Sequence, residues 1–207
     1  MGKVSADEVK RFRDQTGLPM MVCKKLLDQA DGDFEKARAA AAAQVKEVAM
    51  KTASRAASAG LVGAYVHHDA RVGALVELSC QTDFVARNPQ IQSLAREVAM
   101  QVTARQPEVV RREQLPSDNV ELERRRVADE YADKPAEVRE KSVEGRMKSF
   151  FEERVLLEQA WVKDDSKTIQ DLLTEASAHT GENIGVVRFA RFRVGETAES
   201  PGNAEST

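Results

Sequence analysis

A β-rich run that ends at Cys80 is followed closely by a helical repeat, and this succession limits how the chain can fold. Apolar side chains alternate along residues 72–80, as in a half-buried strand. After Pro89 they recur at positions 91, 94, 98 and 102, which is helical spacing, and proline suits a first helical position. We therefore expect residues 82–89 to connect a strand to a helix.

The connecting segment carries an aspartate and a phenylalanine side by side. Asp83 has a local reason to lie there, because the free N–H groups and the dipole of a helix N-terminus favour a negative charge. Phe84 has no such reason, since a turn needs no large aromatic side chain. Two placements are open: the ring packs into the core, as large apolar side chains usually do, or it projects as an anchor for a partner's pocket.

Two other β-rich runs can join this strand in one sheet. Residues 61–67 and 71–80 are separated by only three residues, which predicts a hairpin, and residues 184–194 predict a third strand. Three strands leave edges unpaired and a face to be covered. The long helices can cover one face, and a second copy of the chain is a candidate for the other.

The N-terminal region predicts three short helices. Ser5 and Glu8 form a capping box, Gly17 is placed to end the first helix, and Asp33 can cap the third. A second helix can begin after Pro19. Its candidate inward positions are Met21, Val22, Cys23, Leu26, Leu27 and Ala30.

Further helices are expected between the hairpin and the last strand. Residues 118–131 form a charged amphipathic pattern, with Val120, Leu122 and Val127 as its apolar positions and an arginine run as its solvated face. A longer helix can start at Pro135, and Asp165 or Ser166 can cap another that runs to Gly181.

The fold class predicted is therefore α+β, with four segments in order. Residues 1–45 form a three-helix bundle, residues 46–59 a basic connector, and residues 60–195 a core with a three-stranded antiparallel sheet packed with helices. Residues 196–207 contain no large apolar side chain and are expected to be disordered.

Composition excludes several classes of function. The chain has 207 residues, a formal net charge of −3 and only 5% aromatic residues, so it lacks the basic or stacking surface of a nucleic-acid-binding protein. No apolar run is long enough to span a membrane or to act as a secretory leader, which predicts a cytoplasmic location. Cys23 and Cys80 are expected to be buried thiols, not a disulfide.

Metal binding and catalysis are also disfavoured. His67-His68-Asp69 invites a metal site, but adjacent histidines on a strand point to opposite faces, and no HExxH or CxxC spacing supplies other ligands. Cys80 lacks the loop signatures of a nucleophile. We expect no catalytic residue, no metal and no cofactor.

Several motifs resemble one known family. The nonapeptide 80–88, Cys-Gln-Thr-Asp-Phe-Val-Ala-Arg-Asn, resembles the signature of elongation factor Ts. Residues 16–25 resemble that family's T-G-x-x-M-M-x-C-K-K motif, residues 143–148 its V-E-G-R-M/L-K motif, and residues 181–189 its closing G-E-N-I-x-V-x-R-F. The resemblance extends over about residues 3 to 195 and implies that the N-terminal bundle is of the ubiquitin-associated type.

The chain departs from the family pattern at a few positions. Pro19 replaces a usual glycine, and Val22 replaces a usual aspartate. Proline still suits a helix start, but an exposed Val22 would remove a charge from a surface thought to touch the partner. Ala160 and Trp161 stand where the family has proline and phenylalanine.

The resemblance implies a function and the residues that perform it. Elongation factor Ts is the guanine-nucleotide exchange factor of elongation factor Tu, and the single-core form of this chain implies a homodimer. Phe84 would insert near the partner's Mg²⁺ site, and Asp83 would disturb the contacts that hold the metal and phosphates. The implied exchange loop is Thr82, Asp83, Phe84, Val85, Ala86, Arg87 and Asn88, and the implied N-terminal contacts are Met20, Met21 and Lys24.

Two other functions compete with exchange. One is an adaptor of the ubiquitin-associated type or a ribosome-associated module, in which the core is only structural. The other is an enzyme that uses His67, His68, Asp69 and Cys80, which would need a metal or a reactive thiol. The motifs favour exchange in translation elongation, without direct contact to nucleic acid or membrane.

Overall fold

The computed structural model describes residues 4–196, which fold into two compact units. One unit comprises Gly60 and the residues before it, together with Ser79–Ile91 and Asp171–Gly185. The other comprises Leu61–Leu78, Gln92–Gln170 and the described residues from Val186 on. The predicted tail lies outside the described residues except for Glu196, whose carboxylate pairs with Arg191. Within residues 4–196, no helix is both long and apolar enough to cross a membrane.

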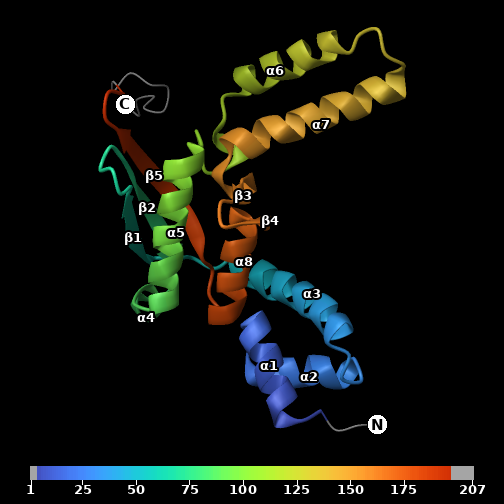
Figure 1. Cartoon of the computed structure of the whole chain (residues 1–207), viewed down its shortest axis with the longest axis vertical. Coiled ribbons are helices and arrows are strands. Elements are labelled where there is room, and N and C mark those ends of the chain that lie inside the picture. Colours follow the sequence, from blue (N-terminus) through green and yellow to red (C-terminus); the bar gives the residue numbers. More distant parts are fainter. Residues whose placement is uncertain (1–3, 197–207) are drawn as a thin grey trace. The chain divides into compact units, whose positions relative to one another are not determined.

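The first three helices begin at the predicted signals, and the first also ends at its predicted glycine (Figure 1). They are α1 (Ala6–Thr16), α2 (Met20–Gln29) and α3 (Phe34–Ala53). Ser5 Oγ accepts a hydrogen bond from Glu8 N, and the Glu8 carboxylate accepts from Ser5 N and Oγ, which holds the pKa of Glu8 below its usual value. Gly17 ends α1 in the left-handed conformation that glycine favours.

A small apolar core joins these helices, and it corrects one expectation about α2. The buried residues are Val9, Phe12, Leu18, Cys23, Leu26, Leu27, Ala37 and Ala41. Met21 is not among them, because its side chain is 75% exposed. Val22 is half-buried and packs against this core, in line with its place among the candidate inward positions.

Helix α3 continues past the predicted end of the bundle. It reaches Ala53, so the first part of the predicted 46–59 connector is helical. The sequence there lacks a wide apolar stripe, but alanine, lysine and glutamate have high helix propensity, and Lys51 pairs with Glu47 one turn earlier at 2.5 Å. Propensity therefore maintains a helix where the hydrophobic pattern does not.

The sheet has the predicted three strands, β1 (Ala59–Val66), β2 (Val72–Cys80) and β5 (Gly185–Arg193), in the order β1-β2-β5 and antiparallel. Helix α5 (Pro89–Arg105) lies along this sheet (Figure 1). The two approach closely at Gly63, where an added Cβ would lie 2.5 Å from the backbone carbon of Ala95. Only glycine fits there, which fixes the distance between β1 and α5.

A second, small sheet was not predicted. Strands β3 (Ala160–Trp161) and β4 (Asp164–Thr168) pair antiparallel, so Asp165 and Ser166 lie in a strand and do not cap a helix. Helix α8 starts later and spans Ile169–Thr180. Asp164 accepts hydrogen bonds from Ser166 N and Oγ. This polar turn was mistaken for a cap because both use the same side chains.

Helices α6 (Ser117–Glu130) and α7 (Ala136–Arg154) form a helical hairpin (Figure 1). Short 3₁₀ turns at Arg112–Gln114 and Leu156–Glu158 precede and follow it. Val127 is buried as expected, but Leu122 is 70% exposed, so its assignment to the apolar face is wrong. The residues packed at the base of the hairpin are Leu115, Met147, Phe150, Phe151 and Val155.

The close approach at Gly63 predicts a stability difference between two glycines. Gly63→Ala should lower the free energy of unfolding by about 1–3 kcal/mol, because the new methyl group would overlap backbone atoms of α5. Gly145→Ala, in α7, is the matched control: its Cβ would meet no atom within 4 Å, so it should raise stability by up to about 1 kcal/mol. Urea unfolding measures both, and equal effects would contradict the close approach.

Candidate functional site

Residues 82–88 form a short, capped helix between β2 and α5. Helix α4 spans Asp83–Ala86, and Thr82 caps it because its Oγ1 accepts a hydrogen bond from Val85 N at 3.3 Å. Asn88 Oδ1 accepts from Gln90 N at 2.9 Å and so caps the start of α5. The predicted strand-to-helix junction is confirmed, with both of its ends fixed by side-chain hydrogen bonds.

The two faces of α4 differ in character. Val85 and Ala86 are buried and attach the loop to its own unit. Phe84 lies on the other face with 84% of its surface exposed, and Asp83 beside it is exposed as well. The alternative in which Phe84 packs into the core is therefore excluded. A large ring held in water by a short, anchored helix is a typical protein-binding element.

The start of the loop is held by a residue that sequence reasoning gave no role. Glu182, in the turn between α8 and β5, accepts hydrogen bonds from Gln81 N at 2.9 Å and Thr82 N at 3.1 Å. Its other oxygen accepts from Thr82 Oγ1 at 2.7 Å. Thr82 and Glu182 lie about a hundred residues apart, so no local pattern predicts their contact. The only signal for Glu182 in the sequence was its place in the family motif at residues 181–189.

Cys80 is unsuited to nucleophilic chemistry. Its thiol is buried and donates a hydrogen bond to the carbonyl oxygen of Thr82. Burial, and then the nearby charge of Glu182, raise the pKa of Cys80, so the thiol stays protonated at neutral pH. Both cysteines are free and buried, as expected.

The two histidines of the β1–β2 turn lie together and not on opposite faces. Strand β1 ends at Val66, before either histidine, and the ring centroids of His67 and His68 are 4.2 Å apart. The argument from strand geometry is therefore wrong. Asp69 accepts a hydrogen bond from Arg71 N, which holds the pKa of Asp69 low and shapes the turn. Across residues 4–196, no group of three histidine, cysteine or acidic side chains could hold a metal ion.

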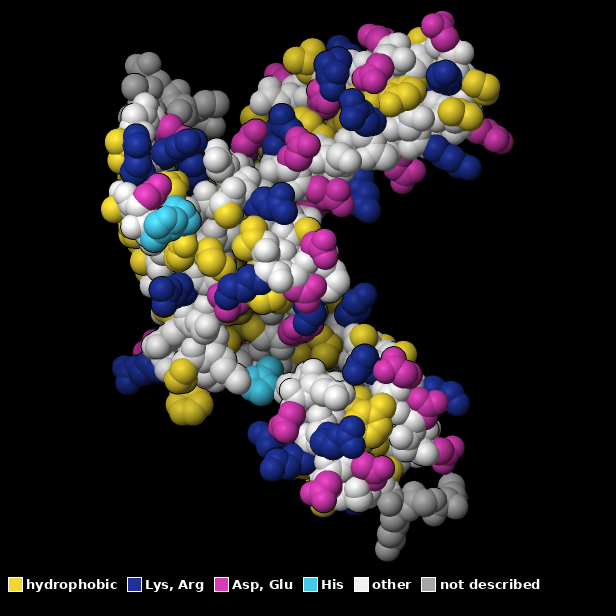
Figure 2. Space-filling model, viewed as in Figure 1, with side chains coloured by type: hydrophobic (Ala, Val, Ile, Leu, Met, Phe, Trp, Pro, Cys, Tyr) yellow, Lys and Arg dark blue, Asp and Glu magenta, His cyan; other side chains and the backbone are white. Residues whose placement is uncertain are grey.

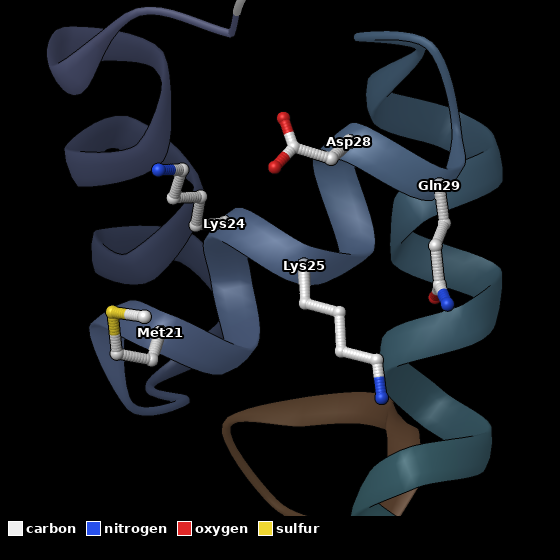
Figure 3. Close-up of a pocket in the computed structure, with 5 residues that line it drawn as sticks. All are labelled: Met21, Lys24, Lys25, Asp28 and Gln29. Carbon is white, nitrogen blue, oxygen red and sulfur yellow. The ribbon is translucent and has the colours of Figure 1, made fainter.

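A second candidate surface lies on α2. A shallow pocket of about 360 Å³ is lined by Met21, Lys24, Lys25, Asp28 and Gln29, all from this helix (Figure 3). Met20 and Lys24 are exposed next to Met21. A flexible methionine among charged side chains is a common feature of protein-binding surfaces.

Comparison with known proteins decides the family. The model of the family described as Elongation factor TS matches residues 19–196. Elongation factor Ts of Anaeromyxobacter dehalogenans strain 2CP-1 is 46% identical over 201 residues, which cover 96% of this chain and 92% of that protein. The chain belongs to the elongation factor Ts family. Its place is therefore among the translation elongation factors.

Other elongation factor Ts proteins match over similar lengths. That of Carboxydothermus hydrogenoformans is 46% identical over 93% of this chain and 90% of the relative. That of Thermotoga neapolitana is 44% identical over 94% of this chain and 98% of the relative. Both the loop at 82–88 and the α2 surface lie within the region that the family model matches.

Proposed function

We propose that the chain is a guanine-nucleotide exchange factor that binds elongation factor Tu carrying GDP and speeds release of the nucleotide. The observation that supports this most directly is Phe84, which projects from a loop that is anchored by buried Val85 and Ala86 and by the Thr82 cap. In this proposal the chain works in the cytoplasm during elongation. It makes and breaks no covalent bond, so it needs no catalytic residue or cofactor.

The exchange step follows from linkage. A GTPase holds its nucleotide through backbone N–H groups, a lysine and Mg²⁺. A factor that binds the nucleotide-free state more tightly than the nucleotide-bound state weakens nucleotide binding, and nucleotide in turn expels the factor. A ten-thousandfold faster release needs about 5.5 kcal/mol of preferential stabilisation of the transition state for dissociation.

Phe84 and Asp83 are proposed to supply this preference together. The ring of Phe84 would enter the partner's GTPase domain near the Mg²⁺ site, and the carboxylate of Asp83 would compete for the contacts that hold metal and phosphates. Thr82, Arg87 and Asn88 would shape and present this tip. Because Val85 and Ala86 are already buried, little conformational entropy remains to be lost when the loop binds.

The α2 surface is proposed to add docking affinity. Met20, Met21 and Lys24 would contact elongation factor Tu away from the nucleotide, which raises the effective concentration of the loop at its site. This division assigns affinity to the bundle and nucleotide release to α4.

The open face of the sheet supports a homodimer. Its exposed apolar residues are Val62, Val66, Leu75, Phe192 and Val194, and a groove of about 410 Å³ runs among several of them. Figure 2 shows apolar side chains along the edge of the molecule where β1 and β2 lie in Figure 1. A contiguous apolar patch of this kind marks an interface, and a second copy offers the same uncovered sheet face. Within the chain, Arg188 Nε and Glu77 Oε2 form an ion pair at 2.6 Å that joins β5 to β2.

Replacing the projecting ring should abolish most of the exchange activity. Phe84→Ala should slow stimulated release of a fluorescent GDP analogue from elongation factor Tu at least about tenfold, a typical loss for a central interface aromatic. Its far-ultraviolet circular dichroism should not change, because the ring makes little contact with its own chain. Leu122→Ala, which removes a similarly exposed side chain from α6, should leave release unchanged. A fully active Phe84→Ala variant would contradict the proposed role.

The α2 surface should affect affinity more than maximal release. Met21→Ser should raise the half-saturating concentration of factor about fivefold and leave the release rate at saturation nearly the same, since the side chain would contact the partner outside the nucleotide site. Titration of the factor in the same assay separates the two quantities. A normal half-saturating concentration would remove Met21 from the interface, and binding without faster release would favour the adaptor alternative for the whole chain.

The sheet face should determine the oligomeric state. Phe192→Glu should shift a dimer to a monomer in sedimentation velocity at micromolar concentration, because it would place a charge in an apolar contact. Leu122→Glu is the control: it changes an equally exposed side chain on the hairpin and should remain dimeric. A monomeric unsubstituted chain would overturn the dimer proposal.

A further inference from the structure

The carboxylate of Glu182 is the main polar support of the loop at 82–88. One oxygen accepts hydrogen bonds from two successive backbone N–H groups, of Gln81 and Thr82, and the other accepts from the Thr82 hydroxyl at 2.7 Å. Three hydrogen bonds to one charged acceptor form a strong anchor, because bonds to a charged group are about twice as strong as neutral ones. The anchor lies at the point where β2 has ended and α4 has not yet begun.

The same contacts fix the direction in which α4 starts. The Thr82 hydroxyl donates its hydrogen to Glu182, so the hydroxyl oxygen is left to accept from Val85 N. Glu182 therefore orients the group that caps α4, and α4 carries Asp83 and Phe84. A change at Glu182 would be transmitted to the exposed ring through the backbone at Gln81 and through Thr82.

The turn that carries Glu182 is itself firmly held. Glu182 N donates to Thr180 Oγ1, and Ile184, which is buried, donates its N–H to Ser177 Oγ at 3.0 Å. Asn183 Nδ2 donates to the carbonyl oxygens of Ala53, the last residue of α3, and of Arg55 just beyond it. The carboxylate thus projects from a fixed support, as a positioning group requires.

We propose that Glu182 is a positioning residue for nucleotide exchange: through Thr82 it holds α4 at the angle that presents Asp83 and Phe84 to the partner. The inference rests on the proposed exchange function and extends it to a residue outside the loop. Glu182 would not touch the nucleotide or the metal, because both of its oxygens are engaged by the loop. Its effect is expected on the rate of release in the complex and not on the affinity of docking.

The test combines one side-chain series with two measurements. The variants are Glu182→Ala, Glu182→Gln, Thr82→Val and the double variant Glu182→Ala/Thr82→Val. GDP release from elongation factor Tu is measured over a range of factor concentrations. Amide hydrogen exchange of the free chain is followed by NMR at Gln81, Thr82 and Val85. Glu140→Ala is the control, since it removes an exposed glutamate from α7 and touches neither the loop nor the turn that supports it.

In the supporting result, Glu182→Ala lowers the rate of GDP release at saturation about tenfold and changes the half-saturating concentration less than about twofold. Its loop amides lose their protection from hydrogen exchange, while the amides of α5 keep theirs. Glu182→Gln recovers part of the rate, because an amide oxygen still accepts from the N–H groups. The double variant is little worse than Glu182→Ala, as expected for residues that act in series. Glu140→Ala keeps both the saturating rate and the loop protection.

Other results would overturn the inference. Glu182 does not position α4 if Glu182→Ala leaves the saturating release rate or the loop protection unchanged. The same conclusion follows if the two substitutions reduce the release rate independently, so that the loss in the double variant is the product of the single losses. Failure of the proposed function is distinguishable, because the unsubstituted chain would then not accelerate release at all. The amide measurement needs no partner, so it would still decide whether Glu182 orders the loop.

Discussion

The contact between β1 and α5 is the constraint on which the rest of this fold depends. With no side chain at Gly63, the strand lies against the backbone of Ala95, so the inner face of the sheet is covered by one long helix. The chain has only a few residues with which to connect the end of β2 to the start of α5. The short helix α4 is the result, and its apolar residues cannot all turn inward.

Local hydrogen bonds then decide which side chains of that connection are free to bind. Thr82 and Asn88 cap the two helices, and Val85 and Ala86 fill the space beneath. Phe84 is left outside. Because Thr82, Val85, Ala86 and Asn88 are each held within the chain, the exposed ring has little freedom to fold back. Its exposure is therefore built into the connection and does not depend on a partner.

Local signals predicted much of this arrangement, and long-range pairings account for most of what was missed. Some helix boundaries depend only on neighbouring residues, and these were predicted correctly. They are marked by the capping box at Ser5, by Gly17, and by Pro19 and Pro89 at or just before helix starts. The β3–β4 pair, the closeness of His67 to His68 and the anchor at Glu182 depend on contacts that no local pattern encodes. Leu122 points outward against expectation, because apolar residue type alone is weak evidence of burial.

An exchange factor must also leave its partner, and the two proposed surfaces are suited to that requirement. The pocket on α2 is shallow and bordered by charged side chains, so it can contribute only moderate affinity to either nucleotide state. Preference for the empty state would then have to come from α4, where the ring is large and its support is stiff. If docking were tight and the loop loose, the factor would bind both states alike and shift nothing, because only differential affinity moves an equilibrium. A stiff loop combined with a weak docking surface is what exchange requires.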